Sequence, residues 1–111
     1  MSALLATARA MDDQNFRWRV MGACIQHAAA LHQAGETGPA GDYALRVLAR
    51  PHDVDQMMLC LVASNAAISA AIIVDENGTV SASGVTDSDI TYVVAESWPV
   101  VAARYGGEGD A

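Results

Sequence analysis

The chain has 111 residues, 52% hydrophobic and 17% charged, so it has the length of one domain and enough apolar side chains to form a core. Its net charge of −7 disfavours direct binding of nucleic acid, because clustered Arg and Lys supply most of that affinity. No apolar run approaches the roughly 20 residues that span a bilayer, and residues 1–13, interrupted by Arg9, resemble neither a signal peptide nor a membrane anchor.

Helical periodicity and capping residues predict a mainly α-helical fold, a small bundle of about four to five helices. The expected helices cover residues 2–10, 14–34, 43–50, 54–64 and 85–102. Asp12 or Asp13 is placed to cap the second of these helices, and Gly35 is placed to end it. Gly and Pro within residues 35–42 predict a loop, after which Asp42 is expected to cap the third helix.

Two conformations are open for residues 66–74. Asn65 can cap a helix through the alanines, whereas the β-branched run at 72–74 favours an extended chain. The pair Asn77-Gly78 suits a tight turn with a positive φ angle. We therefore expect a loop or a short hairpin at about 72–85.

The last expected helix has a start signal and an apolar stripe. Thr86 and Asp89 have the spacing of a capping box, and Pro99 is expected to bend the helix or end its regular part. Residues 1–105 are predicted to be one helical domain, followed by a flexible acidic tail at 106–111. The core stripes of the second and last helices are predicted to include Phe16, Val20, Ile90, Val94 and Trp98.

No catalytic site, metal site or cofactor is predicted. Cys24, His27 and His32 lack a further ligand at zinc-site spacing, and Cys60 lies in an apolar run that disfavours a thiolate. We expect both cysteines to be reduced and buried. The run that begins at Asp75 alternates oxygen-bearing side chains, but it lacks the glycine and the glutamate of a calcium loop. No phosphate-binding, zinc-protease or serine-hydrolase motif occurs in the chain.

Charge is distributed unevenly along the sequence. Residues 1–50 carry five arginines against four acids, a balance of +1, whereas residues 51–111 carry one arginine against nine acids, a balance of −8. Such a molecule can contact copies of itself head to tail or bind a basic partner. Flanking arginines make Trp18 a candidate interface anchor. The predicted interface residues are Arg17, Trp18, Arg19, Asp75, Glu76, Asn77, Thr79, Arg104 and Tyr105.

Three segments resemble the small helical neck proteins that tailed bacteriophages encode beside their capsid genes. The matching residues are Asp13, Phe16, Arg19 and Val20, then Pro51, Val54, Leu61 and Asn65, and finally Asp87, Asp89, Ile90, Val94 and Trp98. The resemblance implies a head-to-tail connector, or adaptor, that forms a ring under the portal and continues the DNA channel toward the tail. It also implies a structural protein of the virion, made in the host cytoplasm and without enzymatic activity.

The partners that this resemblance implies are copies of the chain itself, the portal protein and the next neck or tail protein. DNA would pass through the channel without specific binding, and no membrane is involved. An acidic channel lining suits that role because it repels phosphates. Two alternatives are open: another small virion protein such as a capsid decoration protein, and a small acidic cytosolic module that binds or regulates a basic partner.

Overall fold

Over the described residues, 3–109, with side chains for 5–105, the computed structural model contains six helices and one two-stranded hairpin. The mainly helical prediction is confirmed. The elements are α1 (Ala3–Asp12), α2 (Gln14–Gln33), α3 (Gly38–Ala49), α4 (Gln56–Ser64), α5 (Ala66–Ala71), β1 (Ile73–Val74), β2 (Val80–Ser81) and α6 (Asp87–Gly109).

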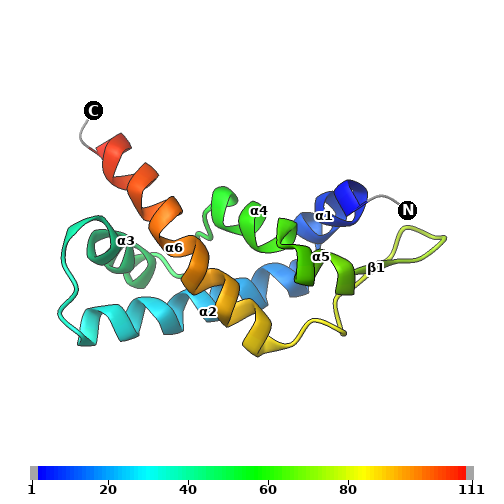
Figure 1. Cartoon of the computed structure of the whole chain (residues 1–111), viewed down its shortest axis with the longest axis horizontal. Helices are drawn as coiled ribbons and strands as arrows, with labels where there is room; N and C mark the ends of the chain where they lie inside the picture. The colour runs from blue at the N-terminus through cyan, green and yellow to red at the C-terminus, as the bar shows by residue number, and fades with distance from the viewer. Residues whose placement is uncertain (1–2, 110–111) are drawn as a thin grey trace.

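The two longest helices, α2 and α6, cross and organise the bundle (Figure 1). α3 folds back beside α2 and also contacts α6, while α4 packs on α6 and α1 packs on α4. The hairpin projects at the end of the molecule opposite α3 (Figure 1). Elements distant in the sequence are therefore neighbours, and the last helix touches three earlier ones.

Capping explains where α2 begins and ends. Asp13 accepts a hydrogen bond from the Phe16 N–H at 2.9 Å, as an N-cap carboxylate does, so Asp13 and not Asp12 is the cap. At the other end Gly35 has φ +73°, and its N–H donates to the His32 carbonyl. The Glu36 N–H donates to the Leu31 carbonyl, which completes a Schellman motif.

The predicted start of the third helix is wrong. α3 begins at Gly38, so the second half of the expected loop is helical, and Asp42 lies inside the helix as an exposed residue. Pro39 occupies the first turn, where its fixed φ fits and its missing N–H costs nothing. Gly41 is buried, and a Cβ there would lie 2.3 Å from the Glu36 carbonyl oxygen, so the position has no room for a side chain.

Both conformations considered for 66–74 occur in succession. The Asn65 side chain accepts hydrogen bonds from the Ala67 and Ile68 N–H groups and starts α5. The chain then becomes extended at Ile72, and the following β-branched residues form β1. β1 pairs antiparallel with β2, Ile73 opposite Ser81, which confirms the short hairpin expected in this region.

α6 begins at the predicted capping box and continues beyond Pro99. The Asp89 N–H donates to the Thr86 hydroxyl at 3.0 Å, and the Thr86 N–H donates to the Asp89 carboxylate at 3.4 Å. Pro99 lies inside the helix, which runs to Gly109, so it does not end the helix. The expected tail thus begins within α6, whereas residues 110–111 and the side chains of 106–111 lie outside the described residues.

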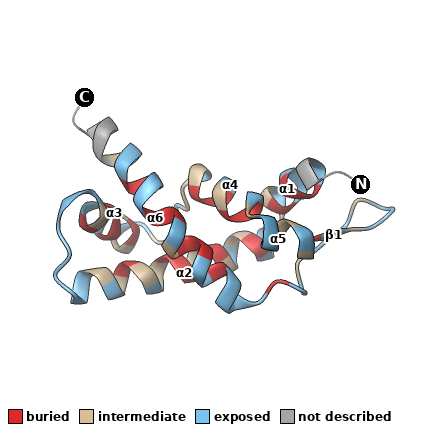
Figure 2. Ribbon diagram, in the orientation of Figure 1, coloured by how far each residue is buried: buried red, intermediate tan, exposed pale blue. Residues whose placement is uncertain are grey.

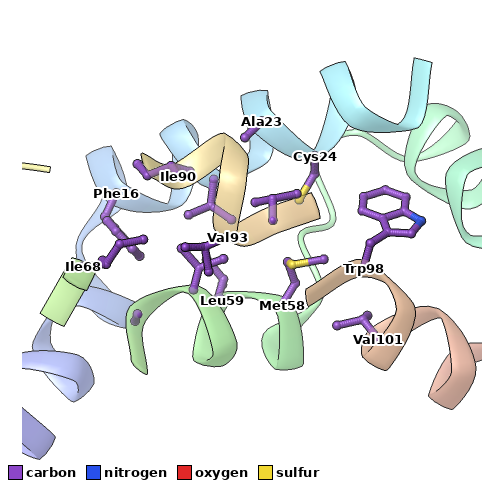
Figure 3. Close-up of a cluster of buried hydrophobic side chains, with 14 of the residues drawn as sticks. Phe16, Ala23, Cys24, Met58, Leu59, Ile68, Ile90, Val93, Trp98 and Val101 are labelled. Carbon is purple, nitrogen blue, oxygen red and sulfur yellow. The ribbon is translucent and has the colours of Figure 1, made fainter. Parts of the chain in front are cut away.

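One hydrophobic core receives side chains from all the helices (Figure 2). The residues of both predicted stripes are among the buried ones, so the stripe of α6 packs against its own chain. Figure 3 shows these side chains meeting between α2, α4 and α6. Trp98 lies at one end of this cluster, where its indole N–H donates to the Ala40 carbonyl at 3.1 Å. Its ring also contacts those of His27 and Tyr43, with centroids 4.8 and 4.7 Å away.

The two tryptophans provide a direct test of this core. We expect Trp98→Ala to lower the free energy of unfolding by about 3 to 5 kcal/mol, because it creates a cavity and removes the hydrogen bond to the Ala40 carbonyl. Trp18→Ala is the control and should cost less than about 1 kcal/mol, since Trp18 is 49% exposed. Urea denaturation followed by circular dichroism measures both values, and equal losses would contradict this account.

Candidate functional site

Trp18 forms one wall of an open groove on the surface of α2. The groove has a volume of about 150 Å³, and the ring of Trp18 meets that of His52 edge-on with centroids 6.3 Å apart. The residues that line this Trp18 groove are Gln14, Arg17, Trp18, Met21, His52 and Val54. Pockets for small molecules measure roughly 300–1,000 Å³, so the groove suits one or two side chains of a partner.

Arg17 and Arg19, predicted together as interface residues, have different roles. Arg17 borders the Trp18 groove and is half-buried, and one of its N–H groups donates to the Met11 carbonyl at 3.2 Å. A guanidinium has five N–H donors, so others remain for a partner. Arg19 instead holds the segment between β2 and α6.

The guanidinium of Arg19 makes three contacts with that segment. It donates to the carbonyls of Ala82, at 2.9 Å, and of Val85, and it forms an ion pair with Asp87 at 3.0 Å. These contacts join residues more than 60 positions apart in the sequence. Arg19 is thus an internal clamp, and its role as an interface residue stays a prediction.

The hairpin turn, residues 75–79, contains the remaining acidic interface candidates. The carboxylate of Asp75 accepts hydrogen bonds from the N–H groups of Asn77, at 2.9 Å, and Thr79, at 2.8 Å, so Asp75 shapes the turn. Gly78 supplies the positive φ, +81°, and the guanidinium of Arg9 lies beside it. Glu76 is exposed, and its carboxylate has no ion-pair partner within the described residues.

The last two interface candidates lie near the end of α6. Tyr105 is half-buried; its ring lies 5.8 Å from that of Tyr43 and 5.5 Å from the guanidinium carbon of Arg46. Arg104 is exposed. These positions are far from the hairpin, which Figure 1 shows at the opposite end of the molecule. The predicted interface residues therefore form separate surfaces.

The described residues contain no arrangement that resembles a reactive centre. Cys24 is buried, and burial, aided by the charge of Asp55, raises the pKa of its thiol to about 12, so it is neutral. Burial also lowers the pKa of His27, whose ring packs on Trp98. No group of three or more metal-ligating side chains is found in residues 5–105. The helices of this range also include none with the length and hydropathy needed to span a bilayer.

Several exposed apolar side chains were missed from the sequence. Tyr92 and Val100 on α6 are 68% and 50% exposed. Their spacing of eight places them on one side of a helix, off the buried stripe, which a helical projection of 87–102 would have identified. Leu45 and Ile73 are also exposed, and no local pattern distinguishes them from core residues. The apolar surface is thus distributed over several elements.

Comparison with known proteins gives no relative: no protein-family model, no characterised protein and no solved structure matches this chain. The described residues form an aromatic groove bordered by a cation, a projecting acidic turn and a closed core, and the groove and the turn are surfaces suited to binding.

Arg19→Met tests the internal clamp, because it keeps the aliphatic stem and removes every donor. We expect the free energy of unfolding to fall by about 1 to 2 kcal/mol, since two carbonyl contacts are lost and the ion pair is exposed and weak. Amide hydrogen exchange should accelerate in residues 82–87. Arg17→Met, which removes one contact with a carbonyl, is the control and should leave that exchange unchanged.

The two thiols should differ in reactivity. Cys60 is exposed, which contradicts the expectation that both cysteines are buried, whereas Cys24 is 3% exposed with a raised pKa. Iodoacetamide at pH 8 should alkylate Cys60 alone in the folded protein and both thiols in urea. Mass spectrometry of peptides locates the label. Modification of Cys24 without unfolding would show that the core opens readily.

Proposed function

We propose that this protein is a structural subunit of the head-to-tail connector of a tailed bacteriophage. In this proposal copies of the chain form a ring under the portal and continue the DNA channel toward the tail. The observation that carries the proposal is the pair of unlike surfaces on one small molecule: a groove with an aromatic wall and a cation, and an acidic turn that projects at one end.

Unlike surfaces suit a ring because of its symmetry. Each subunit of a ring presents one surface to the preceding copy and a different surface to the following one. A symmetric dimer instead uses one self-complementary patch on both copies, so that patch would have to contain both the groove and the turn. The net charge of −7 supports a channel through which DNA slides, since phosphates are repelled by the lining.

The closed core supports a structural role of this kind. The stripe of α6 is used within the chain, so contacts between copies must come from surface features such as the Trp18 groove and the hairpin turn. The resemblance of the three sequence segments to phage neck proteins is the reason to propose that this assembly is a head-to-tail connector. The proposal assigns no catalytic step to any residue.

Mass in solution and imaging test this proposal. We expect light scattering to give multiples of 11.6 kDa, or negative-stain images to show a collar once the portal protein of the same genome is added. A portal protein from an unrelated phage is the control and should show no collar in the images. A chain that stays monomeric and ignores its own portal would overturn the proposal and favour a small acidic binding module.

A further inference from the structure

The Trp18 groove has the chemistry of a site for a carboxylate on an apolar stem. Trp18, Met21 and Val54 provide apolar surface, and Arg17 provides a positive charge that its bond to the Met11 carbonyl holds in place. A guanidinium beside an aromatic ring favours a partner that offers both an anion and methylene groups. Glutamate combines these in a side chain small enough for a groove of about 150 Å³.

Three acids close to the groove in the sequence bond to other groups, and none of them forms an ion pair with Arg17. Asp13 caps α2, Asp55 accepts from the Met57 N–H at 2.8 Å, and Asp53 pairs with Arg46 at 3.6 Å. The lining itself contains no carboxylate. Among the described residues Arg17 thus forms no ion pair, in a chain whose acids outnumber its basic residues by thirteen to six.

We propose that the Trp18 groove of one copy binds the hairpin turn of a second copy, with Glu76 as the side chain that enters it. This proposal rests on the head-to-tail assembly proposed above and specifies its contact. Glu76 is exposed beside the apex of a turn that Asp75 and Gly78 hold in one conformation. A turn ordered in advance loses little conformational entropy on binding.

The placement of the hairpin makes the contact one between copies. The hairpin projects at one end of the molecule, with its turn pointing away from the helices (Figure 1). When its turn occupies the groove of a neighbour, each pair of copies still has one unfilled groove and one unused turn. The contact therefore propagates from copy to copy, and it closes into a ring when the rotation between successive copies divides a full turn.

A zero-length cross-link tests the contact directly. The chain contains no lysine, so a lysine introduced into the groove is the only lysine available to react. Arg17→Lys keeps the charge and places an amine in the groove, which a carbodiimide joins to a carboxylate in direct contact with it. We expect covalent dimers and larger species whose joined peptides contain position 17 and Glu76. Mixing light and ¹⁵N-labelled chains shows that the link is between copies.

Matched variants show whether the cross-link depends on Glu76. Adding Glu76→Gln to Arg17→Lys should abolish the link, whereas adding Glu36→Gln, at an exposed acid in the loop between α2 and α3, should leave its yield unchanged. Arg50→Lys, which places an amine at the exposed end of α3, should give no link to Glu76. Circular dichroism verifies that each variant is folded.

The outcomes separate the two proposals. Absence of the link between position 17 and Glu76 at high protein concentration, or a link to Glu36 or Glu96 in its place, overturns the groove contact even if rings form. A link that appears and depends on Glu76 in a chain that ignores its portal supports the contact between copies and overturns the connector function.

Discussion

The crossing of α6 over α2 and α3, centred on Trp98, is the constraint on which the other features depend. A buried indole needs both apolar neighbours and an acceptor for its N–H, and here the carbonyl of Ala40 is that acceptor. Meeting both needs fixes the position of the first turn of α3 relative to α6. It also fixes the rotation of α2 about its own axis, because Phe16 and Val20 must face the core.

The rotation of α2 determines what its other residues do. With Phe16 inward, Trp18 lies 200° further round an ideal helix and faces outward, beside the chain that connects α3 to α4. Arg19, one step on, faces the segment before α6 and holds it. One helix thus contributes to the core, to an internal clamp and to the groove, and each contribution depends on the same packing.

The sequence predicts local structure well where a short side chain satisfies the backbone beside it. Asp13, Asn65 and Thr86 all cap helices as their patterns indicate. The prediction fails where contacts between segments distant in the sequence determine the structure. The two arginines beside Trp18 are equivalent in the sequence, yet one of them meets Asp87, 68 positions away. Similarly, α3 starts before Asp42, and its first turns include Gly41, which lies against the Glu36 carbonyl in a contact that periodicity does not reveal. The exposure of Cys60 follows from the face that α4 turns to the core.

The late position of α6 in the chain has a consequence for synthesis. A ribosome adds residues one at a time, and the stripe of α6 emerges after every surface that it covers on α2, α3 and α4. Until then the apolar faces of those helices have no final partner, and the nascent chain is exposed to premature association. We therefore expect the core to be completed only once α6 has been made, so that contacts between copies form after its stripe has packed on the earlier helices.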